Sequence, residues 1–169
     1  MSDKEIIKDL SQAAGAVVSI ELFHVDELNI CKAQGICIDE NTPSRLEQHP
    51  DASLLACADE QEVEETLYSH LLRSNCPVTG QPDWGTVFIR YQGKKTCHAS
   101  LLAYIISYRQ HNGFHEQCVE QIYADIWQNL KPNKLMVYAT YTRRGGLDIN
   151  PCRVSDEDWL VEPIRLSRQ

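Results

Sequence analysis

The stretch Thr86-Val87-Phe88-Ile89-Arg90-Tyr91 is rich in β-branched and aromatic residues, and it predicts a strand over residues 85–92. Downstream of this strand the chain shows helical apolar spacing twice and then strand-like alternation. The predicted elements are, in order, a helix at 100–110, a helix at 114–130, a strand at 135–142, a turn at 143–146 and a returning segment at 147–151. The order strand, helix, helix, strand, strand predicts an α+β fold with a mostly antiparallel sheet.

The first 61 residues contain short elements separated by polar connections. The pattern predicts an exposed helix at 3–13, a strand at 17–23, a short strand at 35–39 and a connection at 39–60. Residues 62–73 fit two interpretations. Apolar residues recur every four positions, at Val63, Leu67 and Leu71, which suits a short helix, while the residues between them suit an extended approach to the next loop.

The chain of 169 residues carries a formal net charge of −8, and this charge is unevenly distributed. Residues 1–70 hold 15 acidic and 4 basic side chains, whereas residues 71–169 hold 9 acidic and 12 basic ones. An acidic protein is a poor ligand for the phosphate backbone of nucleic acid, so duplex or tRNA binding is not expected as its main role. The more basic second part suits a small phosphorylated ligand.

The sequence also bears on the cellular compartment of the protein and on the redox state of its cysteines. No apolar run reaches the roughly 18 residues of a membrane span, and the N-terminus lacks the pattern of a signal peptide. We therefore expect a cytoplasmic protein without membrane contact. Seven cysteines, with no CxxC pair, predict reduced thiols and not a disulfide framework.

The segment Ser74-Asn75-Cys76-Pro77-Val78-Thr79-Gly80-Gln81-Pro82-Asp83-Trp84 is a loop rich in turn-forming residues. It places one thiol and one carboxylate seven residues apart, which suits a nucleophile with a nearby proton donor. Taken alone, Cys76 could also be a buried inert thiol, and Asp83 a turn residue before Trp84. The loop is therefore a candidate active site.

Three motifs together resemble a known enzyme family. They are Cys76-Pro-Val-Thr-Gly-Gln-Pro-Asp83, Ser107-Tyr-Arg-Gln-His-Asn-Gly-Phe-His-Glu116 and Tyr141-Thr-Arg-Arg-Gly-Gly-Leu-Asp-Ile-Asn-Pro151. In order and spacing they resemble the NADPH-dependent 7-cyano-7-deazaguanine reductases, nitrile reductases of queuosine biosynthesis, a pathway of tRNA modification. The likeness covers nearly the whole chain and is greatest to the second half of the long, two-module form.

The resemblance implies a fold and a division of the chain. It implies the tunnelling fold shared with GTP cyclohydrolase I, with an antiparallel sheet, two helices on one face and the order β-β-α-α-β-β. Residues 62–169 would form the catalytic module. Residues 1–61 would be an incomplete N-terminal portion with a linker and the first strands.

The resemblance also implies the chemistry of two residues. The Cys76 thiolate would attack the nitrile carbon and form a covalent thioimide, and Asp83 would supply protons to the nitrogen. NADPH would deliver hydride in two rounds, giving 7-aminomethyl-7-deazaguanine. A partly desolvated site would favour the neutral, proton-donating form of Asp83.

Two further pairs match the binding residues of the family. His115 and Glu116 match its substrate pair, and Arg144 and Gly145 match its NADPH contact. Each pair also has a simple structural interpretation, as a helix N-terminus with its favoured acidic residue and as a hairpin turn with solvated charges. A zinc site at His111, His115 and Cys118 is disfavoured, because Asn112-Gly113 breaks the helix between the two histidines and because this family does not depend on metal.

One family motif is missing. In the one-module form Glu-Ser-Lys-Ser-(Phe/Leu)-Lys starts the helix before the His-Glu pair, but here Cys97-His98-Ala99-Ser100-Leu101-Leu102 occupies that place. In the two-module form the motif lies in the first module, which this chain does not contain. We expect either a fragment of a longer reductase or a chain completed by a second module or a second copy. Alone it is predicted to have weak or no reductase activity; the alternative is a non-catalytic binding or partner module.

Overall fold

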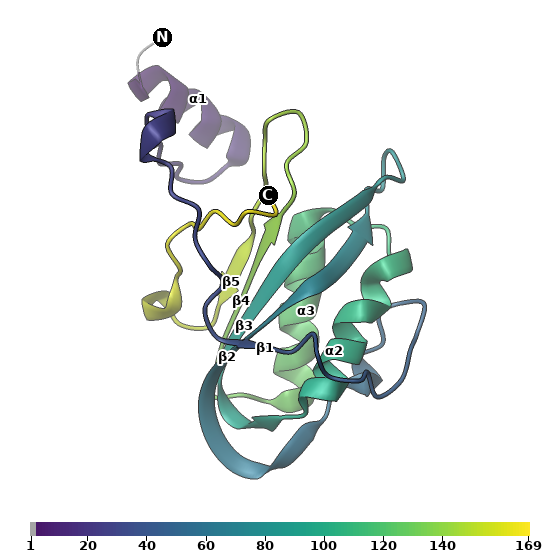
Figure 1. The fold of residues 1–169 in the computed structure, drawn as a ribbon. Helices are drawn as coiled ribbons and strands as arrows, with labels where there is room; N and C mark the ends of the chain where they lie inside the picture. The colour runs from purple at the N-terminus through teal and green to yellow at the C-terminus, as the bar shows by residue number, and fades with distance from the viewer. Residues whose placement is uncertain (1–2) are drawn as a thin grey trace.

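A single mixed sheet, five-stranded within residues 3–169, forms the centre of the structure, a computed structural model that describes those residues (Figure 1). Its strands lie in the order β1 to β5, and every neighbouring pair is antiparallel except β1 with β2. The strands are β1 (Ile36–Cys37), β2 (Cys57–Asn75), β3 (Pro82–Thr96), β4 (Lys134–Tyr141) and β5 (Cys152–Val154). The predicted α+β class is confirmed, and the order from β2 onward is β-β-α-α-β-β.

The long hairpin of β2 and β3 resolves the open prediction for residues 62–73 as a strand. Its register runs from Cys57 opposite Thr96 to Asn75 opposite Pro82, with shifts between Cys57 and Glu62 and between Ser69 and Leu72. A spacing of four residues is a multiple of the strand period of two, so Val63 and Leu67 fall on the same face of the sheet. The apolar period of four is therefore compatible with a strand at Val63 and Leu67, whereas Leu71 lies in the second register shift.

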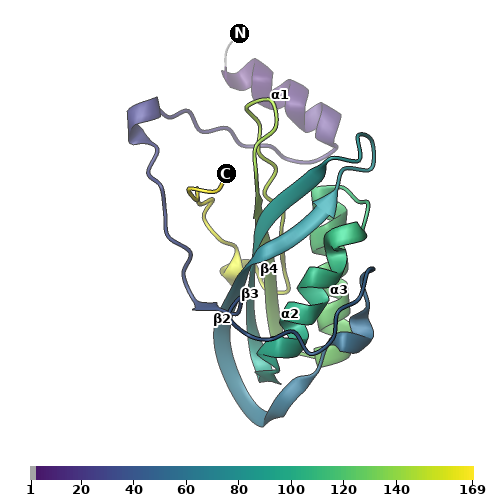
Figure 2. The same cartoon turned by 45° about the vertical axis from the view of Figure 1, so that its right-hand side comes forward.

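Helices α2 (His98–Ile106) and α3 (His115–Leu130) cover one face of the sheet (Figure 2). Alternate β3 residues Val87, Ile89 and Tyr91 point into the core beneath these helices. A short 3-10 turn, Ser107–Gln110, extends α2, so the predicted helix at 100–110 changes geometry near its end. Helix α3 ends where Lys131 adopts left-handed backbone before a proline.

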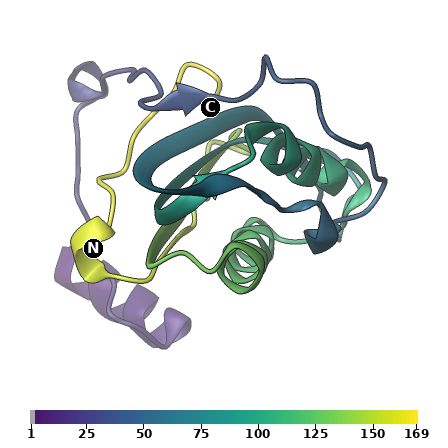
Figure 3. The same cartoon turned by 90° about the horizontal axis from the view of Figure 1, so that it is seen from below.

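The opposite face of the sheet is covered by segments from both ends of the chain (Figure 3). Phe88 points to this side and packs with residues of β4 and of the C-terminal segment. Cys31 forms an isolated parallel β-bridge with Leu166, and the Cys31 N–H donates to the Arg165 carbonyl at 2.7 Å. The two terminal segments are thus held together across the sheet.

The N-terminal region departs most from the predictions. The exposed helix is confirmed as α1 (Asp3–Ala14), but the predicted strand at 17–23 is wrong: no strand forms there, and Val17 is 99% exposed. A strand requires a neighbour to complete its hydrogen bonds. The β2 edge instead pairs with the two residues of β1, which is all that forms of the predicted strand at 35–39.

Two other boundaries were misplaced. The strand predicted over 85–92 is longer than predicted, since β3 continues to Thr96. The returning strand begins only at Cys152, because Arg144 and Leu147 close a tight turn by exchanging backbone hydrogen bonds. None of the helices in residues 3–169 has the length and apolar composition that a membrane span requires.

Candidate active site

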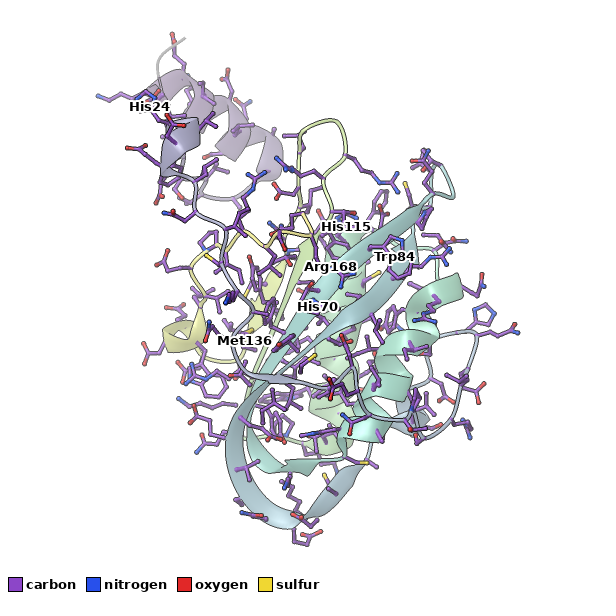
Figure 4. The ribbon with its side chains drawn as sticks, in the orientation of Figure 1. His24, His70, Trp84, His115, Met136 and Arg168 are labelled. Atoms are coloured by element: carbon purple, nitrogen blue, oxygen red, sulfur yellow. The ribbon has the colours of Figure 1, made fainter. Side chains whose placement is uncertain are left out.

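A cavity of about 90 Å³ lies at one end of the sheet, where three segments distant in sequence meet. The segments are the loop after β2, the start of α3 and the turn after β4, and Figure 4 labels His115 at this end. Five of the six predicted site residues line the cavity: Cys76, Asp83, His115, Glu116 and Arg144. The sixth, Gly145, is exposed in the adjoining turn and is not a lining residue, and its φ of +57° suits glycine there.

The Cys76 loop is closed by its own backbone. The Cys76 N–H donates to the Gln81 carbonyl at 2.8 Å, and the Gly80 N–H donates to the Cys76 carbonyl at 2.8 Å. Hydrogen bonds from the Thr79 hydroxyl, and then from backbone N–H groups of the same turn, lower the pKa of the half-buried Cys76 thiol below its ordinary value. Because the thiolate is the nucleophile, the loop favours the reactive form.

Asp83 is the buried acid of the site, with only 3% of its surface exposed. Its Oδ2 lies 3.4 Å from Nε2 of His115. The His115 ring in turn stacks on the Tyr141 ring, with centroids 3.8 Å apart and planes 3° from parallel. Gly85 makes room for this stack, because a Cβ there would lie 3.2 Å from the Tyr141 ring. The imidazole is therefore fixed between a carboxylate and an aromatic face.

The start of α3 is attached to the end of β2, which brings His115 beside Asp83. The Asn75 N–H donates to the His111 carbonyl at 2.8 Å, and the Gly113 N–H donates to the Asn75 carbonyl at 3.1 Å. Gln117 closes the first turn of α3 by accepting from the N–H of the residue before the helix. These contacts explain why Asn112-Gly113 interrupts the helical pattern at this point.

Two polar groups of the site have no protein partner that would compete with a ligand. Nδ1 of His115 is buried and makes no hydrogen bond, which is costly unless something else supplies one. Glu116 is exposed at the first turn of α3 and lines the same cavity. Together they offer an imidazole nitrogen and a carboxylate to a polar heterocycle.

The Arg144 side chain packs against the Cys76 loop. Its Nη1 donates to Gln81 Oε1 at 2.8 Å and weakly to Thr79 Oγ1 at 3.5 Å, and its Nη2 donates to the Pro82 carbonyl at 3.1 Å. Nη2 also lies 2.6 Å from Asp83 Oδ1. That last contact is an ion pair by distance without the angles of a directed hydrogen bond, since Asp83 Oδ1 has no bonded donor. A guanidinium here also suits the phosphate of a dinucleotide, so this residue fits the implied NADPH contact.

Several residues of the site were not predicted as such. Tyr141 supports His115, while Phe114 and Ile149, both about half exposed, form apolar walls of the cavity. All three stand inside the motifs that identified the site, but their contacts depend on sheet register and loop shape, which local patterns do not show. Within residues 3–169, no three His, Cys, Asp or Glu side chains converge as metal ligands.

The stretch that replaces the missing family motif lies far from the site. Thr96, just before it, pairs with Cys57, whereas the Cys76 loop follows Asn75 at the other end of the same hairpin. Ser100 in this stretch bonds within the first turn of α2, where its hydroxyl donates to the Cys97 carbonyl at 2.8 Å. This stretch therefore adds nothing to the cavity of its own chain.

Comparisons with known proteins show which proteins this chain is similar to. A family model described as QueF-like protein matches residues 82–158. Proteins named NADPH-dependent 7-cyano-7-deazaguanine reductase are similar to this chain: one from Acinetobacter baumannii is 76% identical over 163 residues and one from Paraburkholderia phytofirmans is 53% identical over 168 residues. The matches cover 96% and 97% of this chain but only 60% and 61% of those proteins.

One solved structure is also similar. The apo form of the archaeosine synthase QueF-Like aligns with a TM-score of 0.49 at 17% identity, covering 57% of this chain and 95% of that chain.

Proposed function

We propose that this chain, which is similar over most of its length to proteins named NADPH-dependent 7-cyano-7-deazaguanine reductase, carries the nucleophile and the substrate-binding pair of such a nitrile reductase. The observation that supports this most directly is the cavity shared by Cys76, Asp83, His115 and Glu116. The product would be the aminomethyl compound, 7-aminomethyl-7-deazaguanine, used in queuosine biosynthesis.

The first step is attack of the Cys76 thiolate on the nitrile carbon. A carbon–sulfur bond forms, the carbon–nitrogen triple bond becomes a double bond, and the nitrogen takes a proton, giving a thioimide. Asp83 is the buried acid in the same cavity and is assigned as the proton donor. Conversion of the nitrile to an aminomethyl group then takes up two hydrides and two protons in all, and the carbon–sulfur bond breaks between the two rounds.

Substrate recognition is assigned to the start of α3. The Glu116 carboxylate accepts hydrogen bonds from the amino and ring N–H groups of the deazaguanine, and the unpartnered Nδ1 of His115 supplies a second polar contact. The stack of His115 on Tyr141 keeps the imidazole from rotating, so this contact is made without loss of side-chain freedom.

NADPH, when bound, supplies the hydride. Arg144 would hold one of its phosphates, and Gly145 would let it approach the backbone of the turn. A cavity of about 90 Å³ is much smaller than the roughly 300 Å³ or more of typical ligand sites, so a dinucleotide needs walls beyond this cavity. We propose that a preceding module, or a second copy of the chain, provides them in the tunnelling fold. All seven cysteines are unpaired, which suits a cytoplasmic location.

The test is covalent adduct formation. The purified chain is mixed with 7-cyano-7-deazaguanine without NADPH, and its intact mass is measured before and after. We expect a gain of one substrate mass, since addition to a nitrile releases nothing. If no adduct forms at millimolar nitrile, the non-catalytic binding module becomes the better description.

Steady-state reduction is predicted to be weak or absent in the chain alone. The missing Glu-Ser-Lys-Ser-type motif removes cofactor contacts, so the thioimide would form but not be reduced efficiently. Oxidation of NADPH is followed by its absorbance in the presence and absence of the nitrile. Turnover at a rate typical of enzymes, about 1 s⁻¹ or faster, contradicts this expectation.

A further inference from the structure

We propose that Arg144 is a positioning residue with two mutually exclusive partners, holding Asp83 and the Cys76 loop when no cofactor is bound and releasing them when a phosphate takes its guanidinium. The proposal goes beyond the NADPH contact of this residue, because it gives Arg144 a task in the cofactor-free protein. Its second half, the exchange of partners, rests on the proposed function.

The first half of the proposal rests on the contacts of the Arg144 side chain. A single guanidinium reaches four parts of the loop: the side chains of Thr79, Gln81 and Asp83 and the carbonyl of Pro82. A turn residue that merely balanced surface charge would not meet this many groups on another segment. The neighbouring Arg143 is such a residue, with one bond to the backbone carbonyl of Gln169 at 3.3 Å.

The position of Asp83 explains why the partner matters. Asp83 is buried, and apart from Arg144 the charged or titratable groups in its cavity are Cys76, His115 and Glu116. The Arg144 guanidinium lies 2.6 Å from Asp83 Oδ1 and compensates the charge of this buried side chain. When Arg144 withdraws, the contact of Asp83 Oδ2 with His115 at 3.4 Å is the ion-pair contact that Asp83 keeps.

The same exchange acts on the nucleophile. Arg144 donates to the Thr79 oxygen, and the hydroxyl of Thr79 bonds to the Cys76 sulfur. Arg144 also neutralises Asp83, whose negative charge opposes a thiolate in the same cavity. In the cofactor-free protein Arg144 therefore favours the thiolate that attacks the nitrile.

Alkylation of Cys76 tests the first half without nitrile or NADPH. The rate of its reaction with iodoacetamide is measured against pH by peptide mass mapping in wild type, Arg144→Gln, Asp83→Asn and the double variant. We expect Arg144→Gln to move the midpoint to higher pH by about 0.5 to 1 unit, and to have little effect when Asp83 is already Asn. Arg144→Lys keeps the charge but not the planar fork and should restore the midpoint in part.

Controls separate this role from a merely structural one. Arg143→Gln removes a neighbouring charge of the same turn and should leave the midpoint unchanged, and thermal unfolding checks that every variant folds. An unchanged midpoint in Arg144→Gln overturns the proposal. A shift of equal size with and without Asp83 also overturns it, because Arg144 would then not act through Asp83.

Binding of adenosine 2′,5′-bisphosphate tests the exchange of partners. Removing the competing carboxylate should free Arg144, so Asp83→Asn is expected to bind this ligand about fivefold more tightly than wild type in a calorimetric titration. In the Arg144→Gln background the same change should have no effect. Equal affinities for wild type and Asp83→Asn, including failure of both to bind, refute the exchange. The nitrile adduct experiment is independent of these outcomes, so loss of one proposal is distinguishable from loss of the other.

Discussion

Replacing Cys76 with alanine is expected to abolish the covalent adduct with 7-cyano-7-deazaguanine completely. Thioimide formation needs a thiolate, and Cys76 is the thiol that lines the cavity with the proposed acid and substrate pair. Hydrogen bonds of the loop also lower the pKa of this thiol, which favours the nucleophilic thiolate. The readout is the intact mass of the variant after incubation with the nitrile, compared with wild type.

A matched cysteine makes this experiment specific. Cys152 is also half-buried, but it lies on β5, and burial raises the pKa of its thiol above the ordinary value. Cys152→Ala should therefore form the adduct as wild type does. An adduct that persists in Cys76→Ala, mapped to any other cysteine, would show that the nucleophile has been assigned to the wrong residue.

The largest effect on stability is expected from Ile122→Ala. Ile122 is fully buried in the core between α3 and the sheet, where truncation leaves a cavity as well as removing apolar contacts. Such a change typically lowers the free energy of unfolding by about 2–5 kcal/mol. Equilibrium unfolding in urea, followed by circular dichroism, measures the difference from wild type.

Val17→Ala is the control for this change. Val17 is almost fully exposed in the segment where a strand was predicted, and surface changes of this kind usually alter stability by no more than about 0.5 kcal/mol. If Val17→Ala proved as damaging as Ile122→Ala, the Val17 side chain would be packed in solution, and its exposed position would be contradicted.

The chemistry of the site was easier to predict than its geometry. Residues such as Cys76 and Asp83 stand in short motifs whose order along the chain is visible in one sequence, and the structure places them in one cavity. The stack of His115 on Tyr141 was not predictable in this way. It depends on Gly85 lying opposite Tyr141 in the ladder between β3 and β4, a register set by pairing across two intervening helices.

Local patterns also failed where the chain has no neighbour to complete a structure. Residues 17–23 alternate like a strand, but alternation specifies only which face would be buried and does not supply a partner for the backbone. The four-residue apolar period of residues 62–73 is shared by helices and strands, so only the pairing with β3 decides between them. The pair formed by Arg144 and Asp83 joins the turn after β4 to the start of β3, which no periodic pattern connects.

The ladder between β3 and β4 has a consequence for how the molecule folds. Gly85 pairs with Tyr141 only after both helices between them have been brought together, so this contact closes a long loop of chain. Non-local pairing of this kind slows folding relative to helical bundles of similar size. Because Asp83, His115 and Arg144 are brought together only when that loop closes, the reactive centre exists only in chains that have completed the slow step. A chain that has formed only the hairpin of β2 and β3 has Cys76 and Asp83 without His115 and Arg144 beside them.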